Sequence, residues 1–249
     1  MKLLELFSGT HSIGKVAKKK GYEIVSVDRD LGGECPFGTG YHSDTHHKVD
    51  IMNWNYKIYP PHHFKVITAS PVCLWWSVLR KSWIGRVCKK IRPDGEPVER
   101  SDIDRDIDEY GKPMVDKVLE IIDYFQPEYY WIENPDGGGM RDYITLPYYV
   151  VDYCKYGLPY RKRTRIWTNI EDFVPLRCKY DCEFSTIIKK ADGTFRKLHN
   201  NTMGTIRCVN RLYNKKPMDE GSGQTLLERY RVPELLIEAL LDNCFEITS

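Results

Sequence analysis

The sequence has little net charge and no long apolar run. Its 37 Lys and Arg residues nearly balance its 35 Asp and Glu residues, which leaves a formal net charge of +2 over 249 residues. Binding to a polyanion would therefore have to rely on local basic patches. No apolar stretch reaches the ~20 residues that a bilayer span requires, and Met1–Phe7 is too short and too acidic for a signal peptide. We expect an intracellular protein of the cytoplasm or nucleus that does not enter a membrane.

Its cysteines do not form the compact pattern of a disulfide-stapled domain. The eight of them are scattered along a chain that is long enough to fold around a hydrophobic core, and 41% of its residues are hydrophobic. We therefore expect reduced thiols and one globular domain with a small appendage. The sequence also contains no internal repeat and no low-complexity segment.

What the chain does contain is an alternation of strand-like and helix-like segments. This order predicts an α/β fold with a mostly parallel sheet and helices on both faces. We expect a main domain over residues 1–169, a small irregular module over 170–225, and a C-terminal helix within 226–249 that packs back on the main domain. Residues 79–112 are charged and poor in core positions, which predicts a long mobile connection.

The first predicted strand runs into the turn Phe7-Ser8-Gly9-Thr10 and then a helix, as in nucleotide-binding turns. Glycine lets a ligand approach the backbone, and the helix N-terminus offers unpaired N–H groups. Asp28 ends the second strand about 20 residues later, where an acid can accept ribose hydroxyls. The spacing is not G-x-G-x-x-G, which argues against a nicotinamide cofactor, and an ordinary βα turn is the alternative interpretation. Asp50 either accepts a hydrogen bond from the exocyclic amine of an adenine ring or is a solvated acid in a loop.

Cys73 lies at a turn beyond a buried strand. The segment Lys65–Ala69 has the pattern of a short buried strand and runs into the turn Ser70-Pro71-Val72-Cys73. A thiol placed there is accessible, and the nearby Arg80 and Lys81 would favour its thiolate, so Cys73 is a candidate nucleophile. The alternative is a small buried hydrophobic residue, because free cysteines are often simply buried.

A carboxylate ends a second buried strand. Tyr129–Ile132 leads directly into Glu133-Asn134-Pro135. A partly buried glutamate has a raised pKa and can hold or donate a proton near neutral pH. The alternative is a structural Glu133 that caps a loop.

Arg163 and Arg165 belong to a basic run between a Gly-Pro turn and the apolar pair Ile166-Trp167. Basic runs are usually solvated, but here the apolar flank predicts that alternate side chains point inward. Guanidinium groups placed there can meet a carbonyl oxygen or a phosphate.

The small module contains Cys178-x3-Cys182, followed by His199 and Cys208. Thiolates and imidazole are the ligands that zinc prefers. The irregular spacing leaves two interpretations open: a zinc set, or unrelated Cys and His residues in a lysine-rich module.

The four segments, in this order and at these intervals, resemble the cytosine-C5 DNA methyltransferase family over residues 3–168. In this chain, Leu6–Thr10 resembles the cofactor loop of the family and Ala69–Cys73 resembles its nucleophile motif. Glu133-Asn134 resembles its acid motif, and Tyr156–Pro159 with the basic run that follows resembles its arginine motif. The chain is similar to the short forms carried by phages and large DNA viruses. The resemblance implies a class I, Rossmann-like methyltransferase fold with S-adenosylmethionine as cofactor. It also implies that the protein is a monomer and that it binds DNA.

The resemblance also implies roles for single residues. Cys73 would attack C6 of a cytosine that is flipped out or single-stranded, Glu133 would protonate N3, and Arg163 or Arg165 would face O2. Residues 170–225 would correspond to the target-recognition region, and residues 79–112 would form a basic lid. The cofactor would contact an aromatic ring, carboxylates that follow strands, and two turns. These cofactor-binding residues would be Phe7, Ser8, Gly9, Thr10, Asp28, Asp50, Ser70 and Pro71. The catalytic residues would be Cys73, Glu133, Asn134, Arg163 and Arg165.

The chain departs from the family pattern at three positions. His11 replaces a glycine, Val72 replaces a proline, and Tyr160 replaces a glutamine, with the arginines shifted by one residue. These departures keep alternatives open: a diverged DNA-binding module of the same fold, an amino-group methyltransferase acting on adenine or cytosine, or an RNA methyltransferase.

Overall fold

The computed structural model describes residues 1–29, 43–199 and 231–244. Its centre is a seven-stranded sheet in the order β3-β2-β1-β4-β5-β7-β6. The strands are β1 (Lys2–Leu6), β2 (Glu23–Asp28), β3 (Thr45–Lys48), β4 (Val66–Ala69), β5 (Tyr129–Pro135), β6 (Tyr148–Asp152) and β7 (Arg163–Thr168). Strand β7 runs antiparallel to both of its neighbours, and all other pairs that involve β1 to β5 are parallel. The predicted α/β fold is therefore confirmed.

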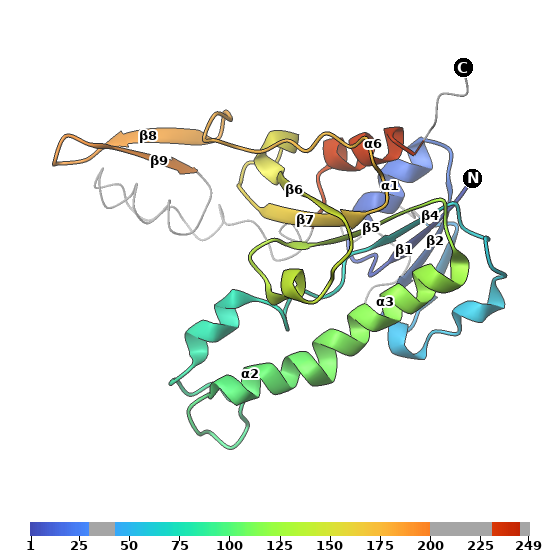
Figure 1. Ribbon diagram of the computed structural model, residues 1–249, viewed down its shortest axis with the longest axis horizontal. Helices are drawn as coiled ribbons and strands as arrows, with labels where there is room; N and C mark the ends of the chain where they lie inside the picture. Colours follow the sequence, from blue (N-terminus) through green and yellow to red (C-terminus); the bar gives the residue numbers. More distant parts are fainter. Residues whose placement is uncertain (30–42, 200–230, 245–249) are drawn as a thin grey trace.

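Helices cover both faces of this sheet (Figure 1). Helices α1 (Ser12–Lys19) and α6 (Glu234–Asp242) pack together on one face, and α3 (Lys112–Phe125) covers the other. Successive strand residues enter opposite core clusters: Leu3 packs on the α1 and α6 side and Leu4 on the α3 side. Strands that are buried on both faces have nearly continuous apolar sequences, which is why these strands could be predicted from the sequence.

The stretch between β4 and α3 is more structured than the sequence predicted. It contains η3 (Val78–Trp83), α2 (Arg100–Asp106) and the π-helical turn η4 (Ile107–Gly111), which continues into α3. The sequence-based expectation of one long connection was wrong for its second half. Asp102 starts α2 by accepting a 2.8 Å hydrogen bond from the Glu99 N–H. The charged residues of this stretch obscured the helical pattern in the sequence, although Asp102 and Asp106 of α2 are buried and form ion pairs with Arg105 and Arg80.

The remaining elements are short. Strands β8 (Ser185–Lys189) and β9 (Phe195–His199) form an antiparallel hairpin that projects from the main sheet (Figure 1). The 3-10 turns are η1 (Ile51–Asn53), η2 (Tyr56–Ile58), η5 (Gly139–Asp142) and η6 (Tyr153–Tyr156). Within the described part of the chain, no helix is both long enough and apolar enough to cross a bilayer.

Candidate active site

The carboxyl ends of the parallel strands bring most of the predicted site residues to one edge of the sheet. Leu6 of β1 is in register with Ala69 of β4, and Ala69 is in register with Ile132 of β5. The residues that follow these three therefore leave the sheet side by side. This edge, next to the point where strand order reverses between β1 and β4, is where open α/β sheets bind ligands.

The turn after β1 has an unusual backbone. Phe7, Gly9 and His11 all have positive φ angles, of 58°, 46° and 52°. Asp28 fixes this turn, because its Oδ2 accepts a 3.0 Å hydrogen bond from the Gly9 N–H. The Ser8 hydroxyl is buried and has no hydrogen-bond partner among the described residues. A ligand hydroxyl or amine at this turn would supply that partner.

His11, which replaces a family glycine, is fully buried. Its Nδ1 lies 3.7 Å from Glu5 Oε2, and its ring meets the edge of His46 at a centroid distance of 5.6 Å. The imidazole therefore points into the protein interior, so the side chain at this position does not cover the outer surface of the turn.

Asp50 follows β3 and caps the next turn. Its Oδ1 accepts a 2.9 Å hydrogen bond from the Met52 N–H, and its Oδ2 lies 3.8 Å from Arg29. These contacts with neighbouring residues are enough to explain where the Asp50 carboxylate lies. Its predicted role at an adenine amine stays a prediction.

The Cys73 loop is tied to both neighbouring strands. The Ser70 N–H donates to the Leu6 carbonyl at 3.3 Å, and the Asn134 Nδ2 donates to the Pro71 carbonyl at 2.8 Å. Asn134 thus holds the Cys73 loop against β5. Cys73 itself is partly exposed. Burial raises the pKa of its thiol, the nearby Lys162 ammonium lowers it, and Glu133 raises it further, so that the pKa lies above its ordinary value.

Glu133, whose charge acts on the Cys73 thiol, is almost fully buried. Its Oε1 accepts two hydrogen bonds, from the Tyr153 hydroxyl at 2.6 Å and from Lys162 Nζ at 3.2 Å. Burial and the Glu133 carboxylate raise the pKa of Tyr153 well above its ordinary value. The phenol therefore stays protonated and acts as a hydrogen-bond donor to Glu133. Lys162 Nζ also lies 4.9 Å above the Tyr153 ring.

The two predicted arginines are directed elsewhere. Arg163 Nε lies 3.3 Å from Asp152 Oδ1. Arg165 donates through Nε and a terminal nitrogen to Asp136 Oδ1, at 3.0 and 2.8 Å, and lies 3.9 Å over the Tyr148 ring. Among the described contacts, the cation that reaches Glu133 is Lys162. Neither Lys162 nor Tyr153 was among the site residues predicted from the sequence.

Strand parity explains this outcome. Glu133 is directly opposite Ile166 in the β5–β7 pair, so the two side chains point to the same face. Counting back in twos from Ile166 along the strand reaches Thr164 and then Lys162, whereas Arg163 and Arg165 fall on the other face. This alternation was the signal in the sequence that would have identified the lysine.

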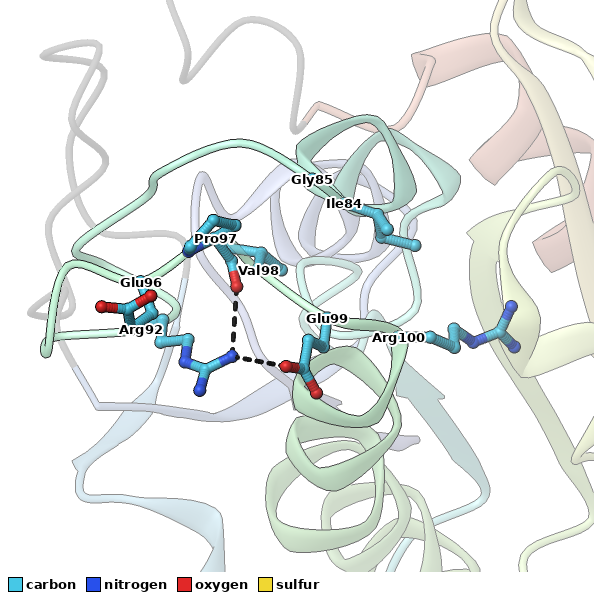
Figure 2. Close-up of a pocket in the computed structure, with 8 residues that line it drawn as sticks. All are labelled: Ile84, Gly85, Arg92, Glu96, Pro97, Val98, Glu99 and Arg100. Carbon is cyan, nitrogen blue, oxygen red and sulfur yellow. Dashed lines mark hydrogen bonds and ion pairs between the residues drawn. The ribbon is translucent and has the colours of Figure 1, made fainter.

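Residues 79–112 contain both buried and exposed basic side chains. Arg80 is buried, pairs with Asp106 and lies 5.2 Å over the Trp75 ring, so it is not part of an open basic surface. A hollow of about 410 Å³ lies in this segment, and Arg92 in its lining donates to the Pro97 carbonyl at 3.1 Å. Figure 2 shows the side chains that line this hollow. The hollow is formed by residues 84–100 and is separate from the Cys73 loop. The exposed basic residues of this segment are Lys81, Arg86, Lys89, Lys90, Arg100 and Arg105, and the last two form ion pairs with Asp104 and with Asp102 and Asp106.

The predicted zinc residues come together in part. Cys178, Cys182 and His199 converge at one point, and Cys154 from η6 joins them. Cys208, the fourth residue of the sequence-based set, lies outside the described residues.

The strand order, the single antiparallel strand β7 and the turn after β1 define a class I methyltransferase fold. No family model matches the chain. It is 38% identical over 250 residues to a probable DNA (cytosine-5)-methyltransferase of Frog virus 3 (isolate Goorha), with 98% of this chain and 100% of that relative covered. The chain therefore belongs to the DNA (cytosine-5)-methyltransferase family, as the motifs indicated.

Two solved structures resemble the chain more distantly. One is described as a putative DNA modification methyltransferase encoded within an E. coli prophage, with 16% identity, a TM-score of 0.42, and coverage of 70% of this chain and 51% of that one. The other is a DNMT2 variant of Spodoptera frugiperda, with 16% identity, a TM-score of 0.40, and coverage of 72% and 55%. The chain spans about half the length of these two solved chains.

Proposed function

We propose that this protein transfers a methyl group from S-adenosylmethionine to C5 of cytosine in DNA, with Cys73 as the nucleophile and Glu133 as the acid. The observation that carries this proposal is the hydrogen bond from Asn134 to the Pro71 carbonyl. It joins the loop that presents the thiol to the strand that presents the carboxyl group. A nucleophile and an acid held in this way suit a ring whose two reacting atoms are close together.

The turn after β1 fits the cofactor. Its backbone is open at Gly9, where an added Cβ would meet only the Phe7 carbonyl, at 3.7 Å. The buried Ser8 hydroxyl without a partner lies in the same turn, with Asp28 alongside it. We assign the cofactor to Phe7, Ser8, Gly9, Thr10, Asp28, Asp50, Ser70 and Pro71. When bound there, S-adenosylmethionine supplies the methyl electrophile.

Cys73 starts the reaction at the base. Its thiolate sulfur forms a bond to C6, and the electron pair of the C5–C6 double bond moves to form a C4–C5 double bond. The electron pair of the C4–N3 double bond moves to N3, where Glu133 supplies a proton. The ring then carries an electron-rich C5, which takes the methyl group. With S-adenosylhomocysteine as the other product of the transfer, loss of the C5 proton to a base restores the C5–C6 double bond as the C6–S bond breaks. The sulfur recovers its electron pair, and N3 returns its proton to Glu133. The enzyme thereby returns to its starting state.

Lys162 and Tyr153 support Glu133 in this cycle. The Tyr153 hydroxyl and the Lys162 ammonium both donate to one oxygen, Oε1, which leaves Oε2 to face the base. The same ammonium stabilises the Cys73 thiolate. We assign Lys162 the electrostatic role that the resemblance placed on Arg163 or Arg165, because both guanidinium groups are held by aspartates.

The substrate base has to leave its stack before it reaches Cys73. A thiol at the edge of a sheet cannot approach C6 inside a duplex, so the cytosine is flipped out or already single-stranded. The exposed Lys81, Arg86, Lys89 and Lys90 provide positive charge for the phosphate backbone in residues 79–112.

A trapping experiment tests the proposal. An oligonucleotide with 5-fluorocytosine, incubated with the protein and S-adenosylmethionine, should form a covalent adduct, because fluorine on C5 cannot be lost as a proton is. Cys73→Ser should abolish the adduct, and Cys88→Ser should retain it. An adduct that survives in Cys73→Ser would contradict the assigned nucleophile.

The product identifies the class of reaction. Mass spectrometry of nucleosides from methylated DNA should detect 5-methylcytosine. N-methylated adenine or cytosine would instead support an amino-group methyltransferase, and methylation of RNA alone would contradict the DNA substrate. A protein that binds DNA without forming any methylated base would be the diverged binding module.

A further inference from the structure

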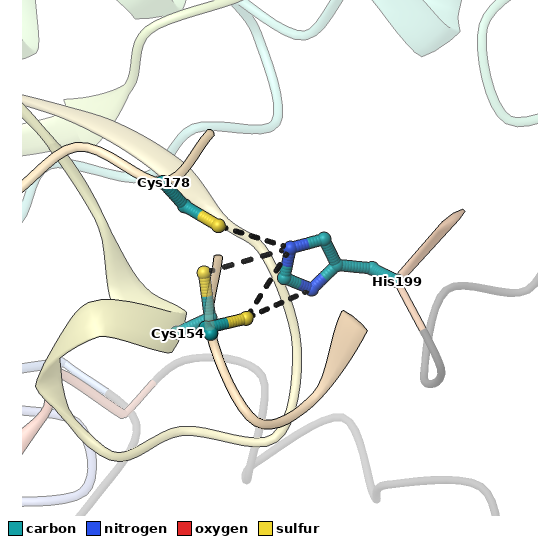
Figure 3. A group of neighbouring side chains, drawn as sticks. Cys154, Cys178 and His199 are labelled. Carbon is teal, nitrogen blue, oxygen red and sulfur yellow. Dashed lines mark hydrogen bonds between the residues drawn. The ribbon is translucent and has the colours of Figure 1, made fainter. Parts of the chain in front are cut away.

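We propose that Cys154, Cys178, Cys182 and His199 bind one zinc ion, which ties the β8–β9 hairpin to the edge of the main sheet. The four side chains come from three separate segments. Cys154 is in η6 at the end of β6, Cys178 and Cys182 lie in the loop before β8, and His199 ends β9. Figure 3 shows the sulfur atoms gathered around the imidazole ring.

The distances fit tetrahedral coordination. The four ligand atoms all lie within 4.8 Å of one another. His199 Nε2 is 3.8 Å from Cys154 Sγ, 3.3 Å from Cys178 Sγ and 3.6 Å from Cys182 Sγ. A tetrahedral zinc ion with bonds of about 2.3 Å to sulfur and about 2.0 Å to nitrogen places sulfur and nitrogen roughly 3.6 Å apart. The observed values scatter around this separation.

Hydrogen bonds alone do not explain the cluster. Each imidazole nitrogen has one hydrogen-bonding position, either as donor or as acceptor, so Nε2 cannot pair with three thiols at once. A cation at the centre accepts an electron pair from every one of these atoms. Cys154, Cys178 and His199 are buried, and buried polar groups without full pairing are costly.

The surroundings suit thiolate ligands. The Tyr180 N–H donates to Cys178 Sγ at 3.3 Å, and the Ser185 hydroxyl lies 3.2 Å from Cys182 Sγ. The Cys178 N–H is itself held by Asp152 Oδ2 at 2.9 Å. Donors to the sulfur atoms and a fixed ligand backbone are the features that orient ligands around a metal ion.

All four positions around the ion would be filled by protein side chains. A closed Cys₃His set is typical of structural zinc and leaves no position for a reactive water molecule. The ion would therefore hold the module in place without taking part in methyl transfer. Its ligand Cys154 directly follows Tyr153, whose hydroxyl binds Glu133. Zinc would thus brace the segment that positions the proposed acid.

Metal content tests the proposal without any measure of activity. The full chain, purified under reducing conditions without chelator, should contain one zinc ion per molecule by elemental mass spectrometry. Cobalt substitution should give the thiolate charge-transfer absorption and the visible bands of a tetrahedral site. Cys154→Ser and Cys182→Ser should each lower the zinc content several-fold.

Matched cysteine variants decide the ligand set. Cys208→Ser should keep one zinc ion, because the structure assigns the fourth position to Cys154, and Cys88→Ser should also keep it. Full zinc content in Cys154→Ser, or its loss in Cys208→Ser, would overturn the assignment. Since a ligand variant can misfold, the cobalt spectrum of the unmodified protein is the second measurement. A spectrum without thiolate charge transfer would also overturn the proposal.

Discussion

The Tyr153 hydroxyl donates a 2.6 Å hydrogen bond to Glu133 Oε1, and this bond joins the end of β6 to the end of β5. Between these two strands in the sheet lies β7, which carries the basic run. Tyr153 is fully buried and keeps its proton, so it acts as a permanent donor to the carboxylate. The proposed acid is therefore positioned by a residue that no catalytic motif contains.

Tyr153→Phe should lower kcat by roughly 10-fold or more, because a hydrogen bond to a charged group contributes about 1.5–3 kcal/mol. The variant keeps the ring in the core, so circular dichroism and the melting temperature should change little. Steady-state methylation of a cytosine-containing duplex provides the measurement. Tyr149→Phe is the matched control: its hydroxyl binds the Glu171 carbonyl, and kcat should stay unchanged. An unaltered kcat in Tyr153→Phe would show that Glu133 needs no such donor.

Lys162→Met should slow alkylation of Cys73 by iodoacetamide at pH 8. The Lys162 ammonium lowers the pKa of a thiol that burial has raised, so its removal lets the pKa rise further and reduces the thiolate fraction. The pH profile of alkylation should move to higher pH in Lys162→Met and return toward the original profile in Lys162→Arg. Lys155→Met, whose ammonium pairs with Asp181, serves as control and should leave the profile in place. Equal profiles in all variants would contradict the electrostatic role of Lys162.

Asp152→Asn should destabilise the fold by about 3 kcal/mol, the usual cost of breaking a buried ion pair. Asp152 is fully buried and binds Arg161, Arg163 and Arg177 as well as a backbone N–H. Urea unfolding gives the free energy change. Asp142→Asn, at an exposed pair with Arg141, should change it by less than about 0.5 kcal/mol. Similar stability of the two variants would contradict the importance of the buried cluster.

Asp28→Asn should weaken binding of S-adenosylmethionine by roughly 10-fold, since the carboxylate both fixes the Gly9 N–H and is assigned to the ribose. Isothermal titration calorimetry measures this change on the folded protein. Asp123→Asn removes a carboxylate at the far end of α3 and should bind the cofactor as before. Unchanged affinity in Asp28→Asn would place the cofactor elsewhere.

The positions of Cys73 and Glu133, the proposed nucleophile and acid, could be predicted because each motif stands at a strand end. Parallel strands bring their carboxyl ends to one edge whatever the loops between them do, so Cys73 and Glu133 were expected to meet. The facing of side chains along β7 was harder to predict. A single shift of register moves a strand residue to the opposite face, and the arginine motif of this chain is shifted by one. That is why Lys162, rather than either arginine, reaches Glu133.

By itself, the sequence determined the fold class, the family and the residues that end the central strands, because apolar periodicity and local turn chemistry are short-range properties. Tertiary structure alone decided which partners reach those residues. Tyr153 meets Glu133 across the sheet, and Cys154 meets His199 from 45 residues away. Such meetings depend on strand order and on the path of the chain between strands, which no local pattern encodes. The physical reason is that contacts distant in sequence arise only once the sheet has been assembled.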